Sequence, residues 1–187
     1  PSPRGRTALR CVVVVAPGAA IGGDGAPPPP GIGLARRMQV SAPDEQHHVL
    51  IEAVQNPTPE VVIVDEIGTE LEAAAALTIS QRGVQMIATA HGPTLENVLK
   101  NPSLCDLIGG VVSVTLGDDE ARRRSVQKSV LERGGPPPFG VAVEMRAIGP
   151  VRVHLGVGVA VDTLLAGCAP HVGRRTVGPE PTRVVAR

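Results

Sequence analysis

Two adjacent carboxylates follow an apolar run near the middle of the chain. Asp65 and Glu66 come directly after the run VVIV, and Gly68 stands two residues later. Such a run predicts a buried strand, and two neighbouring carboxylates at its end are expensive to bury unless they have partners. A bound cation would supply a partner. Alternatively, the two acids only cap a helix that begins near Thr69, where negative charge favours the helix dipole.

A second polar pair follows the next predicted strand. The run MIATAHG carries Thr89 and His91, one helix after the acidic pair. Ligands of open parallel sheets bind at the carboxyl ends of the strands, so we expect the two pairs to lie close together. Four apolar residues followed by Asp-Glu are typical of P-loop ATPases, in which the Asp holds Mg²⁺ and the Glu is the general base. Without the acidic pair, His91 alone would be interpreted as a histidine satisfied at a strand end.

The elements that would position these residues alternate along the chain. Buried β-branched runs predict strands, capped or periodic segments predict helices, and the Pro- and Gly-rich stretch 16–33 excludes both. Strands are expected at 11–15, 60–66, 84–92 and 111–117, and helices at 44–56, 68–83 and 94–101. Asp44 is the expected N-cap of the first helix, and Gly83 is the expected C′ residue of the second. The alternation predicts an α/β fold with a parallel sheet flanked by helices.

The pattern changes after Gly117. Segments 127–133 and 141–147 alternate like half-buried strands and predict a β-rich C-terminal extension. Residues 148–187 mix Val and Gly with scattered Arg and Pro, so we expect an irregular or disordered tail without a convincing element after about Leu165. The predicted organisation is a disordered lead-in at 1–10, a core at 11–147 and the tail at 148–187.

Composition argues against several classes of function. The 187 residues carry 18 basic and 18 acidic side chains and a single aromatic residue, Phe139. Nucleic-acid binding through a basic face or through base stacking is therefore disfavoured. The three cysteines are isolated and form neither a disulfide framework nor a zinc pattern. No apolar run approaches the roughly 20 residues that a membrane helix needs.

Longer stretches resemble the stage III sporulation protein AA family of P-loop ATPases, with its cyanobacterial and plastid relatives. The matching runs lie between Cys11 and Met145 and read IGGDG, GIGLARRMQV, IEAVQNPTPEVVIVDEIGTE, QRGVQMIATAHGPTLENVLKNPSL and SVTLGDDEARRR. The resemblance implies a RecA-like, AAA+-type core that binds ATP and Mg²⁺ and assembles as a homo-oligomeric ring. It also implies a soluble protein of the plastid, or of the cytoplasm if the source is bacterial, with no membrane partner.

The resemblance assigns roles by position in the two polar pairs. Asp65 would be the carboxylate on the Mg²⁺ side, and Glu66 would be the catalytic base that takes a proton from the attacking water. His91, together with Thr89, would sense the γ-phosphate.

Arginines form a second set of candidates. By the same resemblance, Arg36, Arg37 and Arg82 are candidates for phosphate contact or for an arginine finger that acts on a neighbouring copy. The alternative for each, a solvated surface position, stays equally open. The run Arg122–Arg124 follows three acidic residues and is interpreted as pairing with them.

Two features depart from the family pattern. The phosphate-binding loop G-x-x-x-x-G-K-[ST] does not occur in the 187 residues, and APGAA at Ala16–Ala20 stands where relatives carry polar and acidic residues. We expect that loop upstream of Pro1, on a strand that lies between two strands present here. The chain is therefore interpreted as an N-terminally truncated ATPase core that binds Mg-ATP poorly by itself.

Three functional hypotheses follow. The first is the C-terminal part of a Mg-dependent ATPase with Glu66 as general base, active in a longer parent protein. The second is a catalytically inactive ATPase fold that serves as an assembly or binding module. The third is a nucleic-acid-associated protein, which the even charge balance and the single aromatic residue disfavour.

Overall fold

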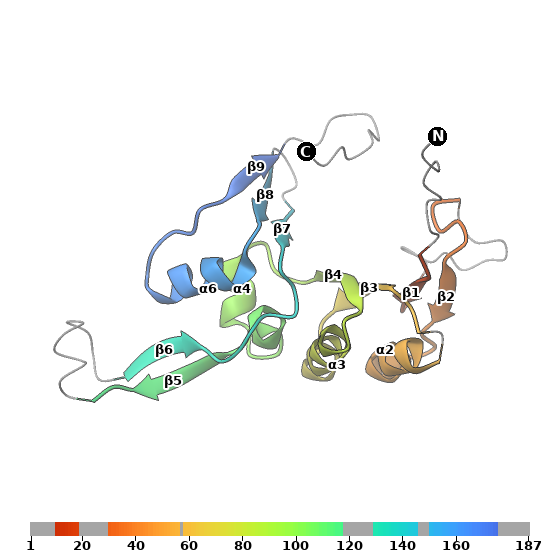
Figure 1. The fold of residues 1–187 in the computed structure, drawn as a ribbon, viewed down its shortest axis with the longest axis horizontal. Helices are drawn as coiled ribbons and strands as arrows, with labels where there is room; N and C mark the ends of the chain where they lie inside the picture. Colours follow the sequence, from red (N-terminus) through yellow and green to blue (C-terminus); the bar gives the residue numbers. More distant parts are fainter. Residues whose placement is uncertain (1–9, 19–29, 57, 118–128, 146–149, 176–187) are drawn as a thin grey trace, which may run out of the picture. The chain divides into compact units, whose positions relative to one another are not determined.

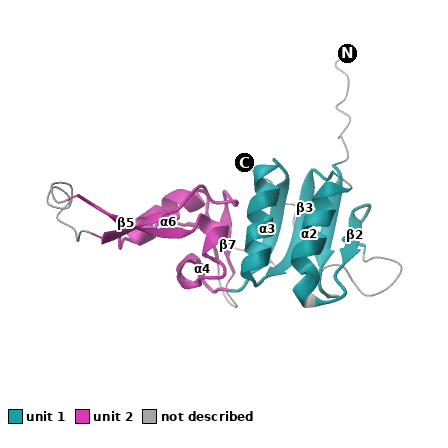
Figure 2. Cartoon of the chain, turned by 90° about the horizontal axis from the view of Figure 1, so that it is seen from below, with its two compact units in different colours: residues 1–91 teal, residues 92–187 magenta. Residues whose placement is uncertain are grey.

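The computed structural model describes residues 10–18, 30–56, 58–117, 129–145 and 150–175. The chain divides into two compact units, unit 1 from Pro1 to His91 and unit 2 from Gly92 to Arg187 (Figure 2). The boundary between the two units falls directly after the second polar pair. The runs IGGDG and Arg122–Arg124 lie outside the described residues, as do 1–9 of the predicted lead-in and 176–187 of the predicted tail.

Unit 1 is built on a parallel sheet. Its strands are β1 (Val12–Ala16), β2 (Arg36–Gln39), β3 (Val61–Ile67) and β4 (Gln85–Ala90), in the spatial order β2-β1-β3-β4 (Figure 1). The two central strands are the β-branched runs of the sequence, and Val13, Val15 and Val62 are fully buried. Continuous apolar runs suit parallel strands because both faces of such a sheet are covered.

Two helices pack against each other beside this sheet. They are α2 (Gln46–Gln55) and α3 (Glu70–Gln81), and Figure 2 shows them side by side in front of the strands. Buried small residues such as Ala73 and Ala76 let α3 approach its neighbours closely. The predicted α/β architecture, a parallel sheet flanked by helices, is confirmed.

The ends of these helices follow the sequence signals in part. Helix α3 ends at Gln81, and Gly83 adopts a left-handed φ of 78°, as expected for a C′ residue. Helix α2 is preceded by a short 3₁₀ turn, η1 (Pro43–Glu45), so its N-cap is Glu45. The predicted N-cap, Asp44, is therefore wrong by one residue, because the 3₁₀ turn takes up that position.

Strand β2 was not predicted from the sequence. It follows the Pro- and Gly-rich stretch and consists of RRMQ, which has little β-propensity. Among the residues that the structure describes, it lies at the edge of the sheet and pairs only with β1. Charged side chains are common on edge strands, where they discourage pairing with another chain.

Unit 2 begins with a short helix and a hairpin. Helix α4 (Leu95–Lys100) and the 3₁₀ turn η2 (Cys105–Ile108) precede strands β5 (Val111–Thr115) and β6 (Ser129–Arg133). The expectation that β5 is a fourth strand of the parallel sheet is wrong, because β5 pairs antiparallel with β6 in a separate two-stranded sheet. A Val-rich run indicates a strand but not its partner or its direction.

The remaining elements of unit 2 are β7 (Ala142–Glu144), β8 (Val151–His154), α6 (Val157–Leu165) and β9 (Gly173–Arg175). Strands β7, β8 and β9 form an antiparallel sheet in that order, which confirms the predicted β-rich character at 141–147. The expectation of an irregular tail is wrong for residues 151–175, which contain two strands and a helix.

Helix α6 escaped prediction because valines and a glycine weaken its helical propensity. Its buried residues Val157, Ala160 and Val161 have helical spacing and form a core with Leu95 of α4 and Ile108 of η2. Tertiary packing therefore overrides propensity here.

The glycine of this helix, Gly158, has a packing role. A Cβ at Gly158 would lie 3.4 Å from the guanidinium carbon of Arg133, which pairs with Asp162 of the same helix at 2.9 and 3.1 Å.

Candidate functional site

The two polar pairs of the sequence meet where the neighbouring strands β3 and β4 end, at their carboxyl ends. Asp65 and Glu66 lie at the carboxyl end of β3, and Thr89 lies near the end of the neighbouring strand β4. Val64 is in register with Ala88, so the polar residues follow the last regular pair of the two strands. The predicted proximity is confirmed, since parallel strands end at the same edge.

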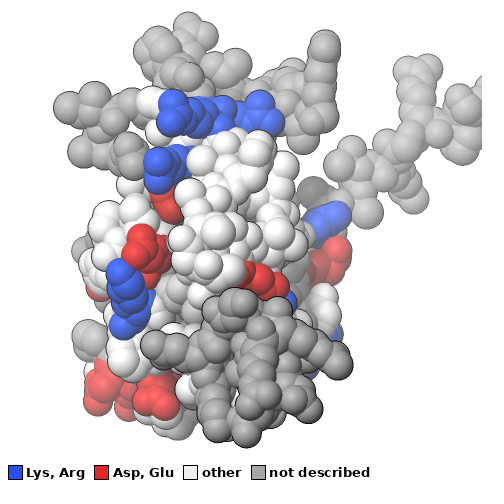
Figure 3. Space-filling model, turned by 90° about the vertical axis from the view of Figure 1, so that its left-hand side faces the viewer, with Lys and Arg blue, Asp and Glu red and all other residues white. Residues whose placement is uncertain are grey.

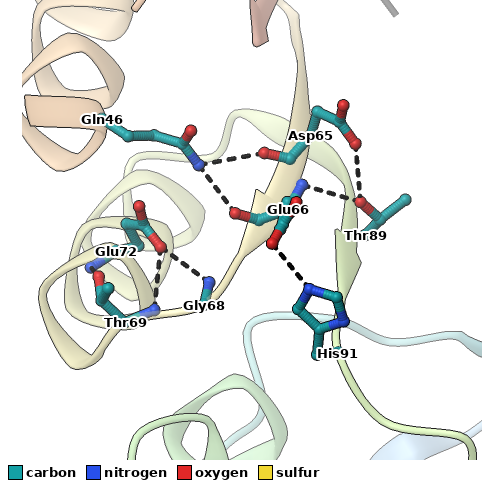
Figure 4. Close-up of polar contacts among 8 residues, drawn as sticks. All are labelled: Gln46, Asp65, Glu66, Gly68, Thr69, Glu72, Thr89 and His91. Carbon is teal, nitrogen blue, oxygen red and sulfur yellow. Dashed lines mark hydrogen bonds and ion pairs between the residues drawn. The ribbon is translucent and has the colours of Figure 1, made fainter. Parts of the chain in front are cut away.

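Hydrogen bonds connect the acidic pair to β4 and to His91 directly after it (Figure 4). The Thr89 hydroxyl donates to Asp65 Oδ1 at 3.1 Å and accepts from the Glu66 N–H at 2.8 Å. His91 Nε2 lies 2.7 Å from Glu66 Oε1. Thr89 is therefore hydrogen-bonded to the carboxylate of Asp65 and to the backbone of Glu66, while His91 is hydrogen-bonded to the carboxylate of Glu66.

The backbone turns at Glu66. This residue has a φ of 58°, in the left-handed region that non-glycine residues rarely adopt. The register of β3 against β4 shifts between Val64 and Ile67. Such a conformation costs about 1–3 kcal/mol and persists only where the surroundings enforce it. The bulge sends neighbouring carboxylates to different partners, Asp65 to Thr89 and Glu66 to His91.

A buried glutamine holds this turn in place. The Gln46 amide nitrogen, at the start of α2, donates to the carbonyl oxygens of Asp65 and Glu66 at 3.1 and 3.0 Å, and the residue is 2% exposed (Figure 4). The sequence analysis missed Gln46. One signal was present, because Gln46 is the polar member of a helical stripe whose other buried residues are Leu50, Ala53 and Val54.

Helix α3 has its own cap and does not use the acidic pair. The Thr69 hydroxyl accepts from the Glu72 N–H at 3.3 Å, and Glu72 Oε2 accepts from the N–H groups of Gly68 and Thr69 at 2.8 and 2.9 Å. This is a complete capping box. The interpretation that Asp65 and Glu66 merely cap the helix is therefore wrong.

The site is open to water. The Glu66 and His91 side chains are 57% and 77% exposed. An ion pair with this exposure contributes little to stability, because solvent screens it. The contact holds one oxygen of the Glu66 carboxylate beside the imidazole of His91.

The oxygen atoms at the ends of these strands suit a hard cation such as Mg²⁺, most of whose coordination positions would be filled by a bound phosphate compound and water. Mg²⁺ commonly takes one or two protein carboxylates and fills its remaining positions with water and phosphate oxygens. Asp65, fixed by Thr89, offers one such carboxylate. The described part of the chain contains no group of three or more His, Cys, Asp or Glu side chains that could hold a metal by itself.

The three candidate arginines are not gathered at this edge. Arg36 is in register with Val13, which is itself in register with Val62, three residues before Asp65. Arg37 follows it on β2, two strands away from β3.

Arg82 lies at the end of the sheet opposite to the acidic pair. It is the C-cap of α3, the helix that leads from the end of β3 back to the start of β4, and so lies at the opposite edge of the sheet. Within one chain, none of the candidate arginines is placed beside Asp65 and Glu66.

Comparison with known proteins supports the resemblance seen in the sequence. Residues 33–122 match the family model described as Sporulation stage III, protein AA. This segment contains the polar residues of β3 and β4 together with Gln46.

Individual relatives extend the similarity over most of the chain. It is 62% identical over 156 residues to the "Protein SEEDLING PLASTID DEVELOPMENT 1" of Arabidopsis thaliana, which covers 83% of the chain and 23% of that protein. It is 55% identical over 166 residues to the "Uncharacterized protein ycf45" of Porphyra purpurea, covering 89% of the chain and 29% of that protein.

A more distant match is the "Stage III sporulation protein AA" of Bacillus subtilis. It is 40% identical over 55 residues, which cover 29% of the chain and 18% of that protein. The chain thus spans less than a third of the length of each of these three relatives.

Two further findings are negative. No solved structure is significantly similar to the chain. Among the residues that the structure describes, no helix is long and apolar enough to cross a membrane.

Proposed function

We propose that this chain is the part of a Mg-dependent ATPase that carries the metal-side carboxylate and the general base. The observation that carries the proposal is the placement of Asp65, Glu66, Thr89 and His91 at one edge of a parallel sheet. Support also comes from the family model that matches residues 33–122. The finer fold assignment, a RecA-like P-loop core, is part of the proposal.

Each polar residue has a defined task in this proposal. Bound Mg²⁺ would neutralise negative charge on the ATP phosphates. Asp65 would hold the ion directly or through water, and the Thr89 hydroxyl donates to its carboxylate and orients it. Glu66 accepts a proton from the attacking water through its free oxygen. His91 contacts one oxygen of Glu66, and in this proposal it senses the γ-phosphate.

The expectation that the missing strand lies between two strands present here is wrong, because in the described part of the chain β2, β1, β3 and β4 pair directly in that order and leave no gap. The open edge of the sheet beside β4 is where a strand carrying the phosphate-binding loop would join. Strand β4 pairs only with β3 among the described residues, and Ile87 near its middle is 54% exposed. Its unpaired backbone groups can accept a further parallel strand. A strand on that side would bring its following loop beside Asp65 and Thr89. In this proposal the loop belongs to a part of the longer protein outside the 187 residues.

Location is inferred from one relative, and assembly is proposed from the family resemblance alone. One relative is named for seedling plastid development, and we infer a plastid location for this chain. We also propose a homo-oligomeric ring, in which Arg36, Arg37 or Arg82 could reach the nucleotide of a neighbouring copy. The exposed position of Arg82 away from its own acidic pair is compatible with that use.

The test uses the longer protein that contains this chain. Phosphate release and nucleotide binding are measured over a range of Mg²⁺ concentrations for the parent protein and for Asp65→Asn. We expect Mg-dependent hydrolysis, and a shift of the Mg²⁺ dependence to higher concentration in the variant, because Asn is a weaker ligand than a carboxylate. Asp44→Asn, an exposed position before α2, is the control.

Two outcomes would count against this function. If the parent protein binds Mg-ATP but never releases phosphate, the chain is a non-catalytic ATPase fold that serves assembly or binding. If Asp65→Asn and Asp44→Asn show the same Mg²⁺ dependence, Asp65 is not the metal-side carboxylate.

A further inference from the structure

Thr89 connects the two residues of the acidic pair through one hydroxyl group (Figure 4). The hydroxyl donates to Asp65 Oδ1 at 3.1 Å and accepts the N–H of Glu66 at 2.8 Å. A hydroxyl has one proton, an ionised carboxylate only accepts and a peptide N–H only donates, so the direction of both hydrogen bonds is fixed. A side chain of β4 thus links the carboxylate of one residue to the backbone of the next.

The peptide group that Thr89 contacts belongs to the left-handed turn of β3. Glu66 has a φ of 58°, and Gln46 holds its carbonyl oxygen at 3.0 Å while Thr89 holds its N–H. Such a conformation persists only where its surroundings enforce it. The N–H side of this turn therefore depends on Thr89 and, through the same hydroxyl, on Asp65.

Asp65 has a neutral partner where other carboxylates of the chain have a basic one. On α4, for example, Glu96 pairs with Lys100 at 2.7 Å. Figure 3 shows acidic and basic side chains next to each other on the face that it draws. Among the described residues, no basic side chain forms an ion pair with Asp65. A hydroxyl orients a carboxylate without neutralising it, so the charge of Asp65 is left for a cation.

We propose that Thr89 is a positioning residue that couples the metal-side carboxylate to the backbone of the general base, and that it does not sense the γ-phosphate. Its one proton is directed at Asp65 Oδ1, which leaves Oδ2 for the cation. A change at the Asp65 carboxylate reaches the Glu66 peptide through the hydroxyl, because hydrogen bonds in a chain polarise one another. The consequence for catalysis rests on the proposed function, whereas the coupling itself does not. Sensing of the γ-phosphate then belongs to His91 alone.

Amide hydrogen exchange of the full 187-residue chain, followed by nuclear magnetic resonance, tests the role of the hydroxyl without nucleotide. Thr89→Val removes the hydroxyl at nearly constant shape, so the protection factor of the Glu66 N–H should fall about 3- to 10-fold, the typical worth of one hydrogen bond. Thr89→Ser keeps a hydroxyl and should restore most of the protection. The N–H of Val62, a buried residue of the same strand, is the internal reference for an intact fold.

A double variant tests the coupling to Asp65. Asp65→Ala removes the acceptor of the hydroxyl proton, so the protection of the Glu66 N–H, corrected for the intrinsic exchange rate of the new sequence, should also fall. Adding Asp65→Ala to Thr89→Val should cause no further loss, because both changes act through one hydroxyl. Losses that multiply in the double variant, or full protection in Thr89→Val, would overturn the proposal.

The longer protein tests the division of roles between Thr89 and His91. The affinities for Mg-ATP and Mg-ADP are measured for Thr89→Val, for His91→Ala and for Thr115→Val, which makes the same change at an exposed position of β5 and is the control. We expect His91→Ala to change the ratio of the two affinities and Thr89→Val to leave it at the control value.

A ratio that shifts as much with Thr89→Val as with His91→Ala would make Thr89 a sensor and overturn its assignment. If the longer protein binds neither nucleotide, the proposed function fails, and the exchange measurements alone decide whether Thr89 couples Asp65 to the backbone of Glu66.

Discussion

At the scale of single residues, the site depends on a glutamine as much as on its acids. The Asp-Glu pair shows why a strand can end in two adjacent carboxylates, since each has a different partner. The backbone at Glu66 adopts a left-handed conformation, and Gln46 contacts the carbonyl groups of Asp65 and Glu66 at this turn. Gln46 is therefore a positioning residue, which acts through the backbone of the acidic pair.

Replacement of this glutamine should destabilise unit 1. Gln46→Leu removes both donors and leaves two carbonyl oxygens beside an apolar side chain, so we expect the free energy of unfolding to fall by about 1–3 kcal/mol. Denaturant unfolding of the 187-residue chain measures the change. Gln55→Leu, an exposed position of the same helix, is the control and should have little effect. Equal losses in the two variants would contradict the assigned role.

The buried pair of Glu144 and His154 in unit 2, in which His154 Nε2 lies 3.0 Å from Glu144 Oε1, should make stability depend on pH at the acid side. Burial raises the pKa of Glu144, but hydrogen bonds from the Leu95 N–H and from His154 outweigh burial and hold the folded pKa below its usual value near 4.5. Between these two pKa values the unfolded chain binds more protons than the folded chain, so stability falls as the pH falls. The contribution is complete above the usual value and is lost as the pH drops through the folded pKa.

Glu144→Gln should remove this component of the pH dependence. Urea unfolding at a series of acid pH values compares the variant with Glu60→Gln, an exposed acid before β3. We expect a shallower acid-side slope for Glu144→Gln alone. An unchanged slope would mean that the pair does not stabilise the folded state through the ionised carboxylate.

At the scale of elements, sequence patterns located most of the segments that carry the site. The β-branched runs gave β1 and β3, and the signals at Thr69 and Gly83 gave α3 with ends close to those observed. These signals are local, so a sequence contains them completely. The proximity of the two polar pairs could also be predicted, because it follows from parallel strand order.

Other features depend on contacts between distant segments and could not be predicted in this way. Strand β2 is stabilised by its pairing with β1, helix α6 by its packing against α4 and η2, and the direction of β5 by β6. The same holds for Gln46, whose two acceptors lie 19 and 20 residues away in the sequence. The position of Gln46 in an apolar stripe of α2 indicates that its side chain is buried. The stripe does not indicate which groups the side chain contacts.

The capping box of α3 offers a test at this scale. Thr69→Ala removes the hydroxyl that accepts from the Glu72 N–H, and loss of such a cap typically costs about 1 kcal/mol. Thr78→Ala, on an exposed face of the same helix, is the matched control. Thermal unfolding of both variants measures the difference. If the Thr69 variant unfolds at the same temperature as the control, Glu72 alone caps the helix.

At the scale of the whole molecule, the two units carry separate chemistry. Unit 1 presents the acidic pair at the carboxyl end of β3, and unit 2 buries the Glu144–His154 pair. The chain spans less than a third of each of three relatives. The proposed activity needs a phosphate-binding loop that the 187 residues do not contain, and a further strand paired with β4 would bring that loop to the site.

The most direct test of this account is ATP turnover by the longer protein with Glu66→Gln. Glutamine keeps the shape of the side chain but cannot take the proton from water, so hydrolysis should fall by about 10²–10⁴-fold while Mg-ATP binding is retained. Glu60→Gln, an exposed acid at the other end of β3, should hydrolyse ATP at the parental rate. Parental turnover by the Glu66 variant, with nucleotide bound, would contradict the assignment of Glu66 as the general base.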